Sequence, residues 1–315
     1  MLSRRNIRIK IMQLLYGATV SERTLTPKIA ENLYREQVSR SYDAFLFTLE
    51  QMSRIIGYTE RDAAVQLKKL TRQLTDDDFN DRFMRNDIAQ LLLKSNPLFE
   101  AVKSKLLNVY IDADLTRKYY NEFKKTDAFV AYSQAIDVQT DENHRAILLD
   151  LVRFLFANDA FIDKLDDHFA TWEDDKSLII GAIKRVIKGL PLQTDFVSRY
   201  QPDEPTVGEF GSLLLFNVVS YSTEIEDLIK PKLQNWDIER VTIIDKIFLT
   251  MATAEALYCP TIPTNVTLDE YIELSKLYST ERSKEFINGV LDGLFKDLET
   301  QGRIRKIDRS TAFEA

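Results

Sequence analysis

The chain has 315 residues, of which only nine are glycine and one is cysteine. Glycine supplies about 3% of the positions, against an average of about 7%, which is too little for the turns and phosphate loops of strand-rich or doubly wound folds. With 44% hydrophobic and 29% charged residues, the composition predicts an all-α protein that buries its core without metal or disulfide staples. The single cysteine, Cys259, excludes an intramolecular disulfide and fits a reducing cytoplasm.

The formal net charge of -7 argues by itself against a polyanionic partner, but the charge is unevenly distributed. The first 21 residues hold four basic side chains and no acid, so this segment carries +4 and leaves -11 for the rest of the chain. A second basic group near the C-terminus is able to lie beside the first. The two groups are Arg4, Arg5, Arg8 and Lys10, and Arg303, Arg305, Lys306 and Arg309. No window reaches 18 uncharged apolar residues, so no membrane partner is expected.

Helical periodicity covers most of the chain, with few breakers. A first helix is expected from about 3 to 17, with Gly17 just past its end. A long helical middle follows from about 24 to 200, and a polar, proline-containing linker at 201–205 precedes four further helices. The expected helical segments after the first are 42–56, 61–74, 87–93, 117–127, 145–156, 175–190, 207–230, 238–257, 268–278 (capped by Thr267 or Asp269) and 283–301.

The first helix has two distinct faces when its residues are placed at 100° intervals. Ile7, Ile11 and neighbouring apolar residues form a stripe that is expected in the core. Arg5, Arg8 and Tyr16 lie on a second face. Arginine near a helix N-terminus opposes the helix dipole at a cost of about 0.3–1 kcal/mol, and no acid is close in sequence. The pattern therefore predicts that an external anion compensates these charges, with Tyr16 as the first candidate to stack on a nucleobase.

Catalytic and metal-binding patterns are weak. The two histidines, His144 and His168, lie in acidic surroundings without a nucleophile elbow, a P-loop or a zinc motif. The acidic run 76–81 with Asp87 partly fits a calcium loop, but Asp81 stands where the loop needs glycine, so a helix-capping loop is the preferred interpretation. We therefore expect neither an enzyme nor a bound metal or cofactor.

Several segments resemble a known family. The pattern RRxxRxKxxQxLY at residues 4–16 is similar to the arginine-rich first helix of NusB, the bacterial transcription antitermination family. The similarity continues through residues 236–276 and is most specific in FINGVLD at 286–292. It spans residues 1–20 and about 205–300, so the long middle looks like an insertion after the first helix of an enlarged family member.

The resemblance implies an all-α fold, a pair of small helical bundles with a large helical insertion. The expected organisation is 1–23 as the first helix, 24–200 as the insertion and 201–315 as the C-terminal helical domain. It further implies RNA contacts and partner-protein contacts. The RNA contacts are Arg4, Arg5, Arg8, Gln13, Tyr16, Arg282 and Phe286, and the partner contacts are Asp245, Lys246 and Glu255. Arg282 stands where some relatives carry an acid, and Phe286 is also consistent with a plain core ring.

The function that the resemblance implies is that of a cytoplasmic RNA-binding antitermination factor. Such a factor binds single-stranded boxA-type RNA together with NusE, a ribosomal small-subunit protein, in the RNA polymerase antitermination complex on ribosomal RNA genes. Two alternatives remain open from the sequence: a helical protein–protein scaffold without RNA binding, and the RNA-binding part of an RNA-modifying system. A methyl-donor site needs a glycine-rich strand-to-helix turn, which the sequence lacks.

Overall fold

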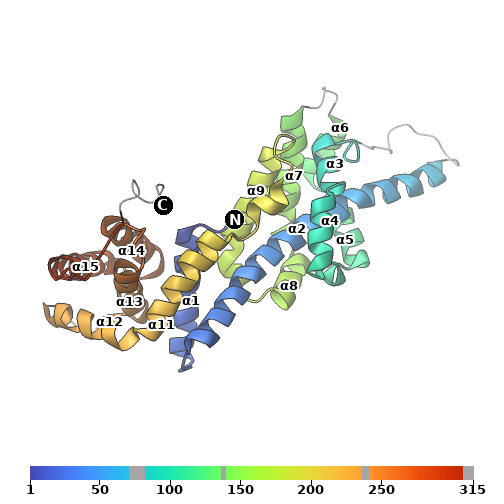
Figure 1. Ribbon diagram of the computed structural model, residues 1–315. Coiled ribbons are helices and arrows are strands. Elements are labelled where there is room, and N and C mark those ends of the chain that lie inside the picture. The colour runs from blue at the N-terminus through green and yellow to red at the C-terminus, as the bar shows by residue number, and fades with distance from the viewer. Residues whose placement is uncertain (71–81, 136–139, 236–240, 308–315) are drawn as a thin grey trace. The chain divides into compact units, whose positions relative to one another are not determined.

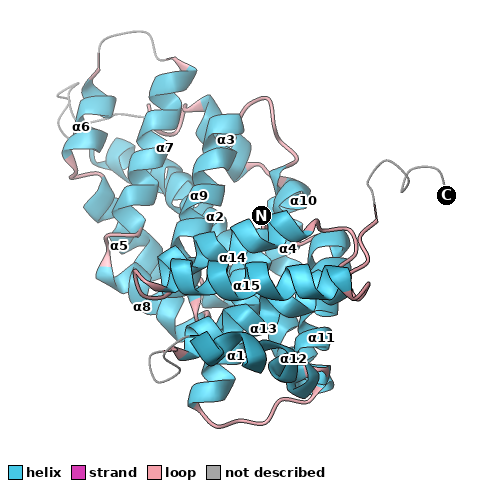
Figure 2. Ribbon diagram, turned by 90° about the vertical axis from the view of Figure 1, so that its left-hand side faces the viewer, coloured by secondary structure: helices cyan, strands magenta, loops and turns pink. Residues whose placement is uncertain are grey.

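The computed structural model describes residues 1–70, 82–135, 140–235 and 241–307, and this part of the chain is helical without any strand (Figures 1 and 2). It divides into two compact units. Unit 1 comprises Met1 and 39–201, and unit 2 comprises 2–38 and 202–315. The all-α prediction is confirmed. Residues 24–38, which the sequence-based division placed in the insertion, pack with unit 2 instead.

Unit 1 is organised around the long helix α2 (Pro27–Leu70), which enters it at Ser39 (Figure 1). The hydroxyl of Tyr42 donates to the carbonyl oxygen of Val197 at 2.8 Å, and Gln51 Nε2 donates to Thr116 Oγ1 at 3.0 Å. These bonds tie α2 to chain segments far away in sequence. The other helices of unit 1 are α3 (Asp87–Leu93), α4 (Asn96–Ser104), η1 (Leu107–Tyr110), α5 (Ala113–Phe123), α6 (Asp127–Gln134), α7 (Asp141–Leu155), α8 (Asp159–His168), α9 (Trp172–Gly189) and α10 (Phe196–Tyr200).

Unit 2 is built around α13 (Ile243–Tyr258), which contacts α1, α11, α12, α14 and α15. Almost every residue from Ile247 to Ala256 is buried, as expected for a helix that is covered on all sides. Helices α14 and α15 lie side by side (Figure 2). The remaining elements of unit 2 are α1 (Arg4–Val20), the start of α2, the π-helix η2 (Pro205–Ser212), α11 (Leu213–Ser220), α12 (Ser222–Ile229), η3 (Lys230–Asn235), α14 (Thr264–Tyr278) and α15 (Ser283–Thr300).

Glycine at position 211 lets three segments of unit 2 approach each other. A Cβ atom there would lie 1.9 Å from Tyr34 Oη and 2.8 Å from Ile7 Cγ2. Tyr34 is fully buried, and its hydroxyl donates to the carbonyl oxygen of Val207 at 3.0 Å, so the ring has no free space to move into. This close approach joins α1 and the first turns of α2 to η2, which explains why residues 24–38 belong to unit 2.

Several predicted helix boundaries were wrong. Helix α1 continues through Gly17 to Val20, and the expected segments 42–56 and 61–74 are parts of the single helix α2, with 71–74 outside the described residues. The expected helix 207–230 is interrupted at Tyr221, which separates α11 from α12. Helix α14 begins at Thr264 after Pro263, so Thr267 is an interior residue of this helix and not its cap.

The close approach at Gly211 yields a stability prediction. We expect Gly211→Ala to lower the free energy of unfolding by about 1–3 kcal/mol, because the added methyl overpacks a space that Tyr34 and Ile7 already fill. Gly17→Ala is the matched control, since nothing lies within 4 Å of a Cβ there. It should stabilise α1 by about 0.5–1 kcal/mol. Urea denaturation followed by circular dichroism measures both, and an unchanged midpoint for Gly211→Ala would contradict the packing described.

Candidate nucleic-acid interface

Helix α1 starts with a capping box followed directly by arginines. The Ser3 hydroxyl accepts from the Asn6 backbone N–H, and the Asn6 side chain accepts from the Ser3 backbone N–H at 3.0 Å. The first turn of the helix contains no acid. The structure nevertheless supplies two carboxylates from distant parts of the chain, Glu255 on α13 and Glu270 on α14. The expectation that an external anion compensates the arginines is therefore wrong for Arg5 and Arg8, because acids that are distant in sequence pair with them.

Arg8 forms a buried bidentate ion pair. Its Nε and Nη2 donate to the two carboxylate oxygens of Glu255, each at 2.7 Å, and the side chains are 3% and 0% exposed. The carboxylate also accepts from the hydroxyls of Thr267 at 2.8 Å and Tyr271 at 3.3 Å. Burial acts to lower the pKa of Arg8, but the hydrogen bonds with Glu255 outweigh it and raise the pKa, so the guanidinium stays charged. The guanidinium also lies 5.1 Å from the ring centre of Phe210.

This burial changes the roles predicted for two residues. The predicted roles are an RNA contact for Arg8 and a partner-protein contact for Glu255. In the structure the two residues form an ion pair with each other inside unit 2. Both are therefore structural residues in this conformation. A signal for this role was present in the sequence. Glu255 stands between Ala254 and Ala256 in an apolar helix, and a carboxylate that is buried there must pair with a cation.

Arg5 remains accessible at the surface. Its side chain is 45% exposed, and its Nε and Nη2 donate to Glu270 Oε2 and Oε1 at 3.0 and 2.9 Å. The hydrogen bond from Arg5 lowers the pKa of Glu270, so this carboxylate stays ionised near neutral pH. Arg8 also reaches Glu270, at 3.4 Å. Glu270 thus bridges the exposed arginine and the buried one.

A hollow of about 400 Å³ lies beside these arginines. Arg4 stands at its edge with the guanidinium 5.5 Å from the ring centre of Phe210, and no acid pairs with Arg4 among the residues that the structure describes. Ile262 and Val266 form an apolar wall. The complete lining is Ser3, Arg4, Arg5, Arg8, Ile262, Val266 and Glu270. A cationic hollow with an apolar wall suits a phosphate with an attached sugar and base.

The remaining predicted RNA contacts lie outside this hollow. Tyr16 is 41% exposed and Gln13 is half-buried, both farther along α1. Arg282 is exposed immediately before α15. Phe286 is only 8% exposed on the buried side of α15, which favours the interpretation as a core ring.

Of the partner contacts predicted on α13, only Lys246 is exposed. Asp245 is 3% exposed and accepts hydrogen bonds from the hydroxyls of Ser279 at 2.7 Å and Ser283 at 3.0 Å. It therefore joins the start of α13 to the start of α15, and its prediction as a partner contact is replaced by this structural role. The spacing Thr242-x-x-Asp245 marks a helix start, and this signal was available in the sequence.

Lys246 lines a second hollow of about 390 Å³ between the end of α1, α11 and α13. Leu15, Val218 and Ile247 are among its apolar lining residues, and Arg23 and Glu226 are among its charged ones. This hollow therefore combines apolar and charged lining residues, a composition that suits a protein-binding surface.

The C-terminal basic group is divided in the structure. Lys306 Nζ donates to the carbonyl oxygens of Glu255 at 3.3 Å and Cys259 at 3.0 Å, at the end of α13, and burial lowers its pKa. Arg303 pairs with Glu224 at 2.5 Å. Arg305 is exposed, and Arg309 lies outside the described residues. Only part of this group is thus available at the surface.

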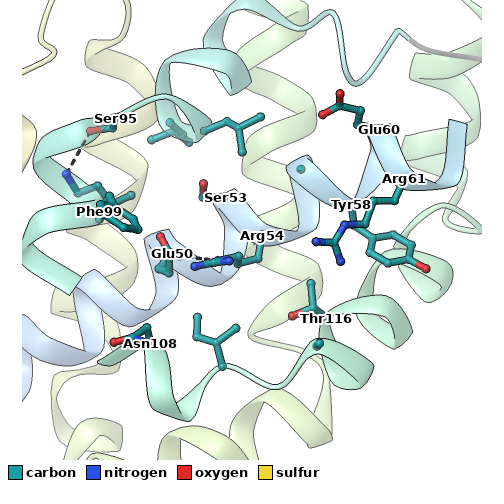
Figure 3. Close-up of a pocket in the computed structure, with 16 residues that line it drawn as sticks. Glu50, Ser53, Arg54, Tyr58, Glu60, Arg61, Ser95, Phe99, Asn108 and Thr116 are labelled. Atoms are coloured by element: carbon teal, nitrogen blue, oxygen red, sulfur yellow. Dashed lines mark hydrogen bonds and ion pairs between the residues drawn. The ribbon is translucent and has the colours of Figure 1, made fainter. Parts of the chain in front are cut away.

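Unit 1 contains a hollow of about 670 Å³ between α2 and the segment from α3 to α5 (Figure 3). The Arg54 Nε donates to the Glu50 carboxylate at 2.6 Å, while Tyr58 and Phe99 provide aromatic walls. No histidine or cysteine lines it. None of the residues predicted as functional contributes to this hollow.

The two histidines have structural contacts. The Nδ1 of His144 is 2.8 Å from the Tyr132 hydroxyl, and His168 stacks on Tyr110 with ring centres 4.1 Å apart. In the parts of the chain that the structure describes, no three His, Cys, Asp or Glu residues gather as a metal site. The calcium-like run 76–81 lies outside those parts.

Comparison with known proteins identifies the family. The NusB family model matches residues 182–296. The transcription antitermination protein NusB of Salinibacter ruber (strain DSM 13855 / M31) is 38% identical over 107 residues, which are 34% of this chain and 67% of that protein. The chain belongs to the NusB family. No solved structure matches it.

The NusB match runs from the second half of α9 to most of α15 and does not include α1, which precedes the insertion in sequence. In the structure α1 packs on η2 and α13, both within the matched region. The basic helix therefore belongs to the same compact unit as most of the NusB-like segment. None of the described helices is long and apolar enough to cross a membrane.

The interior ion pair yields a second stability prediction. We expect Arg8→Met to lower the free energy of unfolding by about 3–5 kcal/mol, because Glu255 then stays buried without a counter-charge. Arg5→Met, on the same helix, removes a half-exposed pair and should cost less than about 1 kcal/mol. Urea denaturation of both variants tests the contrast. Similar small losses for both would show that Arg8 is not an interior residue.

Proposed function

We propose that the protein is an RNA-binding transcription antitermination factor whose unit 2 binds single-stranded RNA along α1. One observation carries the proposal: the accessible guanidinium groups of Arg4 and Arg5 border a cationic hollow on a NusB-like body. Arginine forks match phosphate oxygens in a bidentate geometry, and the apolar wall of Ile262 and Val266 suits a ribose or base.

The surface between Arg5 and Tyr16 provides the second part of the proposed RNA site. Eleven residues of helix separate them, which is about 16 Å at 1.5 Å per residue and returns to nearly the same side of the helix. A strand held by its phosphates at Arg4 and Arg5 can therefore stack an unpaired base on Tyr16. Gln13 offers an amide to a base edge one turn earlier. Arg282 adds an exposed cation, whereas Phe286 is buried on the core side of α15.

The finer assignment follows the family. The proposed RNA is a boxA-type element, read in the cytoplasm together with NusE as part of the RNA polymerase antitermination complex on ribosomal RNA genes. With three or four phosphates neutralised, RNA affinity should be modest and should fall by about 0.7 in log K per phosphate per decade of salt. A protein partner that adds binding energy is consistent with this, and the hollow lined by Lys246 is the proposed place for it.

Binding of a labelled boxA-like oligonucleotide at two salt concentrations tests the proposal. We expect the double variant with Arg5→Ala and Tyr16→Ala to bind at least about tenfold more weakly, since one stacked base alone is worth about 1–3 kcal/mol. The matched control carries Arg117→Ala and Phe99→Ala, which remove an exposed arginine and an exposed ring from unit 1. It should bind like the unmodified protein.

Two results would contradict the proposal. Equal affinity of the unmodified protein and the α1 double variant would favour a protein–protein scaffold. The basic residues of α1 would then face solvent without binding RNA. A loss confined to the unit 1 control would place the RNA on the insertion. Co-purification with NusE, with and without the oligonucleotide, separately tests the partner assignment.

A further inference from the structure

The exposed fork of Arg5 is already occupied in the free protein. Both Nε and Nη2 donate to Glu270, at 3.0 and 2.9 Å, and the carboxylate lines the same hollow as Arg4 and Arg5. A carboxylate and a phosphate present similar pairs of oxygens to a guanidinium. Glu270 therefore occupies the two Arg5 donors that a phosphate would need.

Glu270 is a poor candidate for a purely structural residue. The buried pair of Arg8 and Glu255 is complete without it, since both carboxylate oxygens of Glu255 bind Arg8 at 2.7 Å. Glu270 reaches Arg8 only at 3.4 Å, and its own side chain is 22% exposed. The stronger of its two contacts is thus with a side chain at the surface.

We propose that Glu270 is an internal competitor for RNA: its carboxylate occupies the Arg5 fork in the free protein and must be displaced when a phosphate binds. This inference rests on the proposed RNA-binding function of unit 2. The competition lowers affinity for any polyanion that offers only charge. An RNA with further contacts, such as a base on Tyr16, bears the same displacement cost, but those contacts let it bind tightly despite that cost.

The direct test compares RNA binding by Glu270→Gln and Glu273→Gln at about 150 mM salt. Both remove one negative charge from α14, but Glu273 is exposed one turn away and bonds to Lys276. We expect Glu270→Gln to bind a boxA-like oligonucleotide about three- to tenfold more tightly, and Glu273→Gln to change affinity by less than about twofold. A homopolymeric RNA of the same length that uses the Arg5 fork should gain by a similar factor from Glu270→Gln.

Two further variants define the mechanism. Glu270→Ala, which lacks any acceptor for Arg5, should gain at least as much affinity as Glu270→Gln. In an Arg5→Ala background the gain from Glu270→Gln should fall below about twofold, because the effect acts through the Arg5 fork. Thermal unfolding of each variant checks that unit 2 stays folded.

The outcomes separate the inference from the function on which it rests. If the unmodified protein binds RNA and both Glu270 variants bind equally or more weakly, Glu270 positions Arg5 and the competition is overturned. An equal gain from Glu273→Gln also overturns it, because net charge then explains the effect. If no variant binds RNA, the proposed function itself fails and the inference with it. Binding by the Glu270 variants that exceeds that of the unmodified protein supports both.

Discussion

The pairing of Arg8 with Glu255 is the interaction on which the arrangement of unit 2 depends. Two charges with 3% and 0% exposure require each other, because either alone would bear the full cost of burial. The pair joins α1 to α13 across 247 positions of sequence, and Thr267 and Tyr271 extend it to α14. Bidentate geometry also fixes the rotation of α1 about its axis. Arg4 and Arg5, which precede Arg8 on α1, are therefore held in a defined position beside the hollow.

This constraint explains how a NusB-family protein accommodates a large insertion. The chain leaves unit 2 after residue 38 and returns at residue 202, yet α1 and the first turns of α2 stay in contact with η2. Gly211 permits the close approach of Tyr34 and Ile7 that such packing requires. The insertion has its own apolar core, to which α2 contributes residues from Tyr42 to Ile56. The basic helix thus remains part of the NusB-like body.

Three features could be predicted from the sequence. The low glycine content predicted the helical class, helical periodicity predicted the apolar stripe of α1, and the motifs predicted the family. The sequence did not predict the continuous α2, since polar residues near Arg61 interrupt the apolar pattern while the helix continues. The interior roles of Arg8, Glu255 and Asp245 depend on partners that only folding brings together. For the same reason Glu270 was recognised as part of a family motif but not as the counter-charge of Arg5. Periodicity indicated where most helices lie but not where each begins and ends, and the exposure of each side chain required the structure.

We propose that RNA binds the exposed face of α1, whose position the Arg8–Glu255 pair fixes. Ultraviolet crosslinking of a boxA-like RNA to the full chain, with the attached peptides identified by mass spectrometry, tests it most directly. We expect crosslinks to the peptide that contains Tyr16 and to the segment from Ile262 to Val266, which lines the cationic hollow. Crosslinks confined to residues 39–201, with none in unit 2, would contradict it.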